Sequence, residues 1–207
     1  MTADEMDKLQ FDGGCIAFDF TNTVNTRKHS AYKDYINSFQ NLLLWSEKVK
    51  LLDADRLAAI HEIVDSASGT KAFEYAIYAR EVLHGIFAPI ANNNTPQPAI
   101  IEKFNGLISR SLCHAKFETE DFPNSLSFHQ NNAFADEIID TIVKSAFDVL
   151  TSENFKDKIK ECPGCGWLFL DKSKNGKRRW CDMQACGSND KALRYYHKNK
   201  LNAKSST

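Results

Sequence analysis

The sequence predicts a mainly α-helical fold with minor β-structure, in which a helical N-terminal domain precedes a small module built around cysteines. Two observations carry this prediction. Apolar residues recur at helical spacing in long segments of the first 155 residues, and four of the six cysteines gather in two close pairs near the C-terminus. Of the 207 residues, 43% are hydrophobic, which is enough to build a core.

The N-terminal domain, expected over residues 1–155, has a usual size for one globular unit. In chain order, amphipathic helices are predicted over residues 39–52, about 53–67, about 71–92, about 99–113 and about 133–151. Asp53 is expected to cap the second helix, and Pro89 to kink or shorten the third. Residues 115–119 and 125–129 alternate apolar and polar side chains, which predicts a β-hairpin.

The cysteines Cys162, Cys165, Cys181 and Cys186 follow the pattern C-x2-C-x15-C-x4-C. Two close pairs at this separation suit a tetrahedral zinc site, because each pair holds the metal from one side. The alternative is a disulfide pair, but the rest of the chain favours a reducing compartment and therefore one structural Zn²⁺ ion. Four thiolate ligands leave no open coordination position, so the metal is expected to stabilise the fold and not to act on a substrate.

Around these cysteines the sequence predicts a zinc finger of treble-clef type over residues 156–201. Residues 167–170 and 177–181 are predicted to be two strands of a hairpin joined by an Asn-Gly turn. Residues 191–200 have the composition of a short basic helix. Residues 202–207 are expected to be a disordered tail.

Positive charge is concentrated in the finger. From Lys156 to the C-terminus there are 13 Lys and Arg against 5 Asp and Glu, a formal charge of +8, although the whole chain has −1. The basic side chains predicted to face nucleic acid are Lys174, Lys177, Arg178, Arg179, Lys191, Arg194 and Lys198. The alternatives are a solvated basic tail, or a surface that pairs with a protein or with the acidic N-terminal part of the same chain.

The segment from Ile159 to Lys198 resembles the CGNR zinc finger of many bacterial regulators. It shares a basic lead-in, C-x2-C, W-L-F-L-D, a basic turn, R-R-W-C, four residues, then C-G and a basic helix. It departs from the signature at Ser188-Asn189, where the family usually has Asn-Arg. This departure removes an arginine from a position where a contact would be expected.

The start of the chain, Gly13 to Thr23, is similar to the ABATE-type domain that precedes this finger. The shared pattern is a glycine-led apolar segment that runs into an aspartate and an Asn-Thr pair. The resemblance implies a stress-induced transcription regulator, and an RNA-binding role is also suggested for such proteins.

The segment 19–27, DFTNTVNTR, is unusually polar for a stretch that follows an apolar segment. Asp19, Asn22, Thr23 and Arg27 are candidates to line a pocket for a small-molecule effector, with Arg27 pairing an anionic group. The alternative, which we favour, is that Asp19 and Asn22 cap the next helix and hold the loop through side-chain to backbone bonds.

The chain is not expected to be an enzyme, because the H-E-x-x-H, P-loop, G-x-G-x-x-G and G-x-S-x-G motifs are missing from its sequence. Neither a signal peptide nor a membrane-spanning segment is predicted, so a cytoplasmic location is expected. We therefore expect a DNA-binding transcription regulator that acts through the predicted hairpin and last helix, and that gains specificity as a homodimer. RNA binding is the alternative if Tyr195, Tyr196 or Trp167 is exposed to stack on bases, and a protein-interaction finger is the third.

Overall fold

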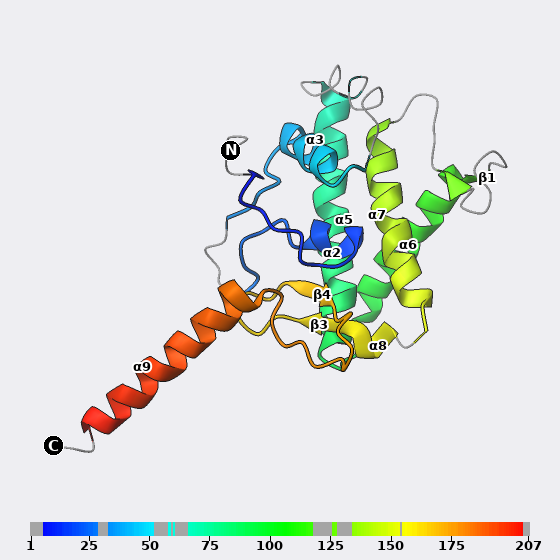
Figure 1. Ribbon diagram of the computed structural model, residues 1–207. Coiled ribbons are helices and arrows are strands. Elements are labelled where there is room, and N and C mark those ends of the chain that lie inside the picture. Colours follow the sequence, from blue (N-terminus) through cyan, green and yellow to red (C-terminus); the bar gives the residue numbers. More distant parts are fainter. Residues whose placement is uncertain are drawn as a thin grey trace.

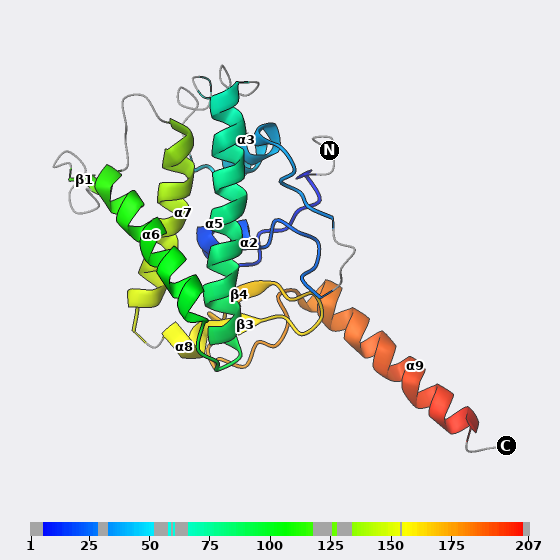
Figure 2. The same cartoon turned by 180° about the vertical axis from the view of Figure 1, so that it is seen from behind.

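A computed structural model describes residues 6–28, 33–51, 58, 60, 66–117, 126–127, 134–153 and 155–204. The side chains of residues 117, 126–127, 134–135 and 197–204 are outside this description. Helices pack side by side above a small two-stranded sheet, and a last helix projects away from this body (Figure 1). The same arrangement seen from behind shows the projecting helix again clear of the body (Figure 2).

Four described helices of the N-terminal part form close to where the sequence predicts them: α3 (Phe39–Lys48), α5 (Ala67–Ala91), α6 (Pro98–His114) and α7 (Phe134–Thr151). A short helix that was not predicted, α2 (Ile16–Thr21), forms in the apolar segment near the start of the chain. Most of the helix predicted over about 53–67 lies outside the described residues. Helix α5 continues past Pro89 to Ala91, and Pro98 occupies the first turn of α6, where the missing N–H costs no hydrogen bond.

The predicted hairpin is present as β1 (Lys116–Phe117) and β2 (Leu126–Ser127), which pair antiparallel. Helix α5 is the centre of the core, because it contacts α2, α3, α6 and α7. Its buried Phe87 meets Phe18 of α2 edge to face, with ring centroids 4.9 Å apart. Burial of aromatic and aliphatic side chains from all these helices therefore holds the N-terminal part together.

The C-terminal part contains α8 (Phe155–Lys158), β3 (Ile159–Glu161), β4 (Leu168–Leu170), the π-helical turn η1 (Met183–Gly187) and α9 (Ser188–Lys204). The predicted pairing of 167–170 with 177–181 is wrong, because β4 pairs with β3, with Lys160 opposite Phe169. Burial explains the choice of partner, since Ile159 is 1% exposed and fills the core, which the charged stretch 177–179 cannot do.

The sheet of the finger and the helices share one hydrophobic core. Ile159 of β3 and Leu168 of β4 belong to the same buried cluster as Phe18 and Leu83. A smaller cluster around the zinc ligands contains Phe169 and Trp180. The finger is therefore packed into the N-terminal part and is not attached through a linker. Among the described residues, no helix combines the length and the apolar character that crossing a membrane requires.

Candidate zinc centre and basic surface

The four cysteines predicted to bind zinc come together at the base of α9. The Sγ atoms of Cys162, Cys165, Cys181 and Cys186 all lie within 4.8 Å of one another, with Cys165 and Cys181 3.5 Å apart. Tetrahedral zinc with Zn–S bonds of about 2.3 Å separates its sulfur ligands by about 3.8 Å. The Sγ atoms of Cys181 and Cys186 are 3.8 Å apart. The cluster thus has the dimensions of a four-thiolate zinc site.

Backbone hydrogen bonds shape the first pair of ligands. The N–H of Cys162 donates to the carbonyl of Trp167, and the N–H of Gly166 donates to the carbonyl of Cys162, each at 2.8 Å. Gly166 has φ +79°, a conformation that favours glycine. A Cβ atom at Gly166 would also lie 2.8 Å from the Cβ of Arg27. Glycine is therefore required both for the turn and for the close approach of an N-terminal segment.

That segment, residues 13–28, is named here the docking segment. The side-chain amide of Asn22 pairs with the backbone of Leu168: Nδ2 donates to its carbonyl at 2.8 Å and Oδ1 accepts from its N–H at 2.9 Å. The carbonyl of Cys165 accepts from the N–H of Arg27 at 2.6 Å and from Oγ1 of Thr26 at 3.1 Å. A zinc ligand is thus positioned directly by the N-terminal part of the chain.

Further contacts extend the docking along the sheet. The indole N–H of Trp167 donates to the carbonyl of Val24 at 2.6 Å, and the N–H of Leu170 donates to the carbonyl of Gly13 at 2.9 Å. Glu161 forms an ion pair with Lys28. Because Trp167 is held in this interface by a hydrogen bond, it is not available to stack on a nucleic-acid base.

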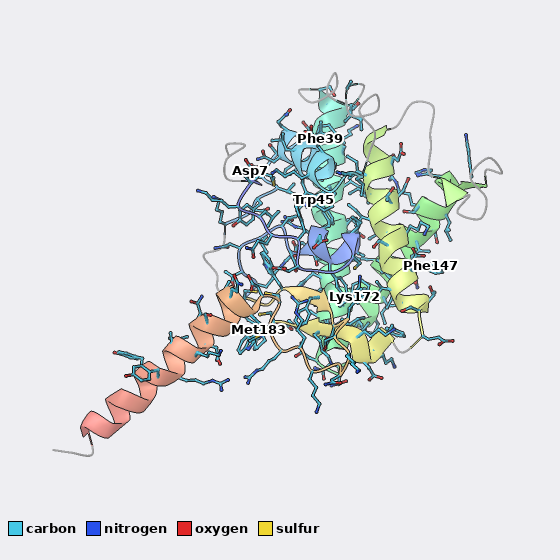
Figure 3. All side chains as sticks on the ribbon, viewed as in Figure 1. Asp7, Phe39, Trp45, Phe147, Lys172 and Met183 are labelled. Atoms are coloured by element: carbon cyan, nitrogen blue, oxygen red, sulfur yellow. The ribbon has the colours of Figure 1, made fainter. Side chains whose placement is uncertain are left out.

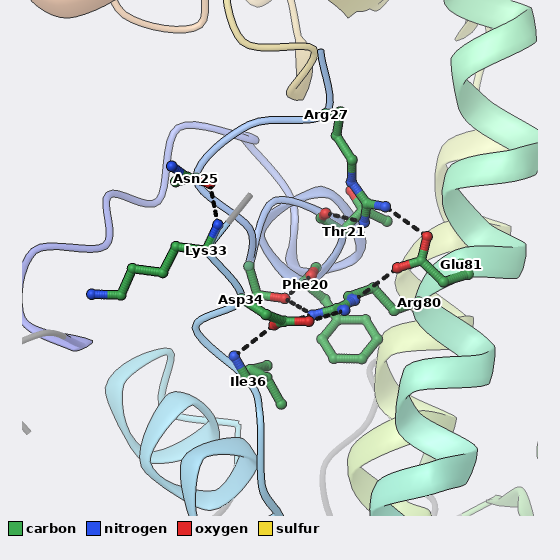
Figure 4. A network of polar contacts seen from close by, with 10 residues as sticks. Phe20, Thr21, Asn25, Arg27, Lys33, Asp34, Ile36, Arg80 and Glu81 are labelled. Atoms are coloured by element: carbon green, nitrogen blue, oxygen red, sulfur yellow. Dashed lines mark hydrogen bonds and ion pairs between the residues drawn. The ribbon is translucent and has the colours of Figure 1, made fainter. Parts of the chain in front are cut away.

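The remaining candidate pocket residues stabilise the docking segment from within. Arg27 donates to the carboxylate of Glu81 at 2.6 Å and to the carbonyl of Thr21 at 2.8 Å. Figure 4 shows this contact beside the pairing of Arg80 with Asp34. Burial raises the pKa of Glu81, but hydrogen bonds and the charges of Arg27 and Arg80 outweigh it and leave that pKa below its usual value.

Thr23 and Asp19 are buried as well. Oγ1 of Thr23 accepts from Arg80 at 3.0 Å, and the carboxylate of Asp19 accepts from the N–H of Gly13 at 2.8 Å. Burial raises the pKa of Asp19 to about 6, against the opposing effect of the Gly13 hydrogen bond. The structure therefore uses Asp19, Asn22, Thr23 and Arg27 in internal contacts. Sequence reasoning missed Arg80, although a charge on an otherwise apolar helix face was a usable signal.

The predicted basic residues divide into two groups. Arg178 points inward: its guanidinium lies 4.9 Å from the ring centroid of Phe169 and donates to the carbonyls of Trp180, at 2.9 Å, and Cys181. Its N–H donates to Asp171, whose pKa is lowered because hydrogen bonds from Ser173 and Arg178 outweigh its burial. Arg178 thus fixes the loop that delivers Cys181 to the metal.

The other basic side chains that the structure describes face solvent. Lys174, Lys177, Arg179 and Lys191 are exposed, and Arg194 is exposed although it pairs with Asp190 at 2.6 Å. Lys198 lies in α9, but its side chain is outside the described ones. The side chains of α9 stand away from the body of the molecule (Figure 3). Tyr195 is 71% exposed.

A groove of 540 Å³ separates the start of α9 from the rest of the finger. Its lining comprises Asn25, Thr26, Pro163, Gly164, Cys165, Arg179, Trp180, Cys186, Asn189, Asp190 and Leu193. Asn189, one of the two residues that depart from the family signature, is exposed on its wall. The guanidinium of Arg179 lies 4.8 Å from the ring centroid of Trp180, so a planar cation also borders this groove.

Comparison with known families agrees with this architecture. The model of the ABATE family, described as "Putative stress-induced transcription regulator", matches residues 14–153. The chain belongs to the ABATE family. The model of the CGNR zinc finger matches residues 158–199. The four close cysteines within these residues fit one structural zinc ion. None of the curated proteins compared with this ABATE chain matches it. The two families are of regulatory and zinc-finger types, which supports a regulatory role.

Proposed function

We propose that this ABATE protein is a transcription regulator that binds DNA through the outward surface of its zinc finger. The observation that carries the proposal is the projection of α9, a basic helix that extends from the zinc centre free of the body (Figures 1 and 2). Its 17 residues correspond to about 26 Å of helix, and the major groove of DNA, about 12 Å wide, admits such a helix.

The phosphate contacts are assigned to the exposed cations. Lys174, Lys177 and Arg179 lie on the loop before the second pair of cysteines, and Lys191 and Arg194 lie on α9. Arg179 lines the same groove as Asp190 and Leu193 of α9, so a nucleic acid at this groove can meet cations of both groups. Arg178 is left out, because its guanidinium is already bound to the backbone beside the metal. Lysine and arginine contacts to phosphate position a protein without reading sequence, so specificity would require a second site, as in a homodimer.

RNA is the second candidate, and two observations favour it. Tyr195 is exposed on α9, where its ring can stack on an unpaired base. The groove beside the zinc centre is also bordered by the stacked pair Arg179 and Trp180, and by the amide of Asn189. These features suit an unstacked base better than a paired one.

The test is binding of the zinc-loaded protein to duplex DNA, single-stranded DNA and structured RNA over a salt series. The variant Lys177→Glu/Arg179→Glu reverses two outward charges, and Lys71→Glu/Lys103→Glu is the matched control at exposed positions of α5 and α6. We expect duplex affinity to fall steeply with salt, to be lost in the first variant and to persist in the second.

A preference for structured RNA would favour RNA binding, the second candidate function, over DNA binding. Equal binding by both variants would contradict the assignment of the contacts. If none of the three nucleic acids binds, the outward surface serves a protein partner.

A further inference from the structure

Two of the four zinc ligands can be reached from solvent. Cys162 and Cys181 are 0% and 2% exposed, whereas Cys165 and Cys186 are half-buried and line the groove of 540 Å³ beside α9. The thiolate is both the form of cysteine that binds a metal and the form that reacts with an oxidant. A small oxidant in this groove therefore meets two thiolates directly.

The two accessible ligands differ in how firmly they are held. The carbonyl of Cys165 accepts hydrogen bonds from two groups of the docking segment. Cys186 lies in the π-helical turn η1, where residues 183–185 are exposed and Met183 stands at the base of α9 (Figure 3). Such turns are rare and frequently occur at functional sites. Cys186 is therefore the ligand with more freedom to move.

A second thiolate lies within reach of Cys186. The Sγ atoms of Cys181 and Cys186 are 3.8 Å apart, and a disulfide bond of about 2.05 Å requires them to approach by about 1.8 Å. Cys165 lies closer to Cys181, at 3.5 Å, but its bonds to the docking segment hold it in place. Movement of the exposed turn η1 thus favours a disulfide between Cys181 and Cys186.

We propose that Cys186 is an oxidation site, at which a hydroperoxide joins Cys181 and Cys186 in a disulfide and so releases zinc. With hydrogen peroxide, Sγ of Cys186 attacks one oxygen, the O–O bond breaks, and Cys186 becomes a sulfenic acid. The other oxygen leaves as hydroxide. The thiolate of Cys181 then attacks Sγ of Cys186 and displaces a second hydroxide. Two thiolates are oxidised, and one peroxide is reduced to two waters with two protons from solvent.

The charges that line the groove suit the leaving hydroxide. Arg179 is exposed and lines the groove together with Cys186, so its guanidinium can stabilise the negative charge that develops on oxygen. The carboxylate in the lining, Asp190, pairs with Arg194 at 2.6 Å, which offsets its repulsion of an anion. The groove thus combines an accessible thiolate with a cation.

Oxidation would act on the base of α9. The disulfide removes two of the four zinc ligands, and loss of the metal removes the folding energy that it supplies. Helix α9 begins at Ser188, directly after the turn that carries Cys186, so it would no longer be fixed to the first pair of ligands. The chemistry itself does not depend on the proposed nucleic-acid function.

The experiment treats the zinc-loaded full chain carrying Cys113→Ser with hydrogen peroxide. Cys113 is exposed, and its replacement removes a competing thiol. A chromogenic indicator follows zinc release, and peptide mass spectrometry identifies the disulfide. We expect zinc release to keep pace with formation of a disulfide between Cys181 and Cys186, and a reductant with added zinc to reverse both.

A glycine in the groove allows access to be tested without changing a ligand. A Cβ atom at Gly164 would lie 3.5 Å from Sγ of Cys186, an ordinary van der Waals contact. Gly164→Ala should bind zinc but release it about three- to tenfold more slowly in peroxide, because the methyl group covers the sulfur. Gly106→Ala is the matched control on α6: its Cβ atom has nothing within 4 Å, and it should react as the unchanged protein does.

Three results would overturn the proposal. The first is zinc that stays bound in excess peroxide. The second is a first disulfide that joins any other pair of the four ligands. The third is an equal rate of zinc release from Gly164→Ala and Gly106→Ala.

Discussion

The inner and outer sides of the zinc finger use similar residue types for opposite purposes. On the inner side, the guanidinium groups of Arg27 and Arg178 bond to oxygen atoms of the protein itself. On the outer side, the cationic side chains of Lys174, Lys177 and Arg179 are exposed. The difference teaches that residue type alone does not identify a binding surface in this chain. What separates the two sides is whether each polar atom already has a partner inside the protein.

The largest effect is expected from loss of zinc. Chelation, or Cys162→Ser, should lower the free energy of unfolding of the whole chain by more than about 3 kcal/mol, since structural zinc supplies folding energy. Because Ile159 and Leu168 belong to the helical core, calorimetry should show one transition that moves to lower temperature. Cys113→Ser, at an exposed cysteine, is the control and should leave the transition in place. A helical transition that is unaffected by chelation would mean that the two parts fold independently.

The next effect concerns the amide that joins the two parts. Asn22→Ala leaves the N–H and carbonyl of Leu168 without partners in a buried position, which should cost about 2–4 kcal/mol in urea unfolding. Asn94→Ala, at an exposed asparagine, should change stability by less than about 0.5 kcal/mol. If the two variants are equally stable, Asn22 does not hold the finger.

Two neighbouring arginines offer a direct contrast between the sides. Arg178→Ala should lower zinc affinity about tenfold or more, because the guanidinium supports the loop that carries Cys181. Arg179→Ala should leave zinc affinity unchanged and reduce the salt dependence of nucleic-acid binding by about one phosphate contact. Competition with a zinc indicator measures the first quantity, and a salt series measures the second. If Arg179→Ala lowers zinc affinity and Arg178→Ala does not, our assignment of Arg178 to the inner side and Arg179 to the outer side is wrong.

The smallest effect is a pH dependence from Asp19. Its folded-state pKa of about 6 lies above the ordinary value of 3.8, so the folded protein binds the proton more tightly than the unfolded chain. The contribution of this group to stability is therefore greatest below about pH 4 and declines as pH rises through about 6. Asp19→Asn should gain stability relative to the unchanged protein between about pH 5 and about pH 7.5, by about 1–2 kcal/mol. Urea unfolding at both pH values measures this gain, and a constant difference between the proteins would contradict it.

Local signals in the sequence predicted much of the fold. The helices α3, α5, α6 and α7 follow from apolar spacing, and the zinc ligands follow from the spacing of four cysteines. The partner of β4 was not predictable in this way. Lys177 to Cys181 directly follows an Asn-Gly pair, which favours a hairpin with 167–170, whereas Ile159 to Glu161 is only three residues long. Only the burial of Ile159 in a distant core decides between them.

The role of the docking segment was equally beyond local reasoning. The sequence shows that Asp19, Asn22, Thr23 and Arg27 form a polar group, and side-chain to backbone bonds were one of its two interpretations. Their partners are far along the chain: Asn22 meets Leu168 across 146 positions, and Arg27 meets Glu81 across 54. Such pairings depend on how helices and sheet pack, which a single sequence does not display. The same limit explains why Arg178 was grouped with Arg179.

Hydrogen exchange of the zinc-loaded protein, with and without duplex DNA at low salt, tests the central claim most directly. Our account predicts added protection confined to residues 174–196. This range contains the exposed cations of the loop and those side chains of α9 that the structure describes. The docking segment and strands β3 and β4 should exchange at unchanged rates, because they are already bonded to each other. Added protection in the docking segment, with none in residues 174–196, would contradict the account.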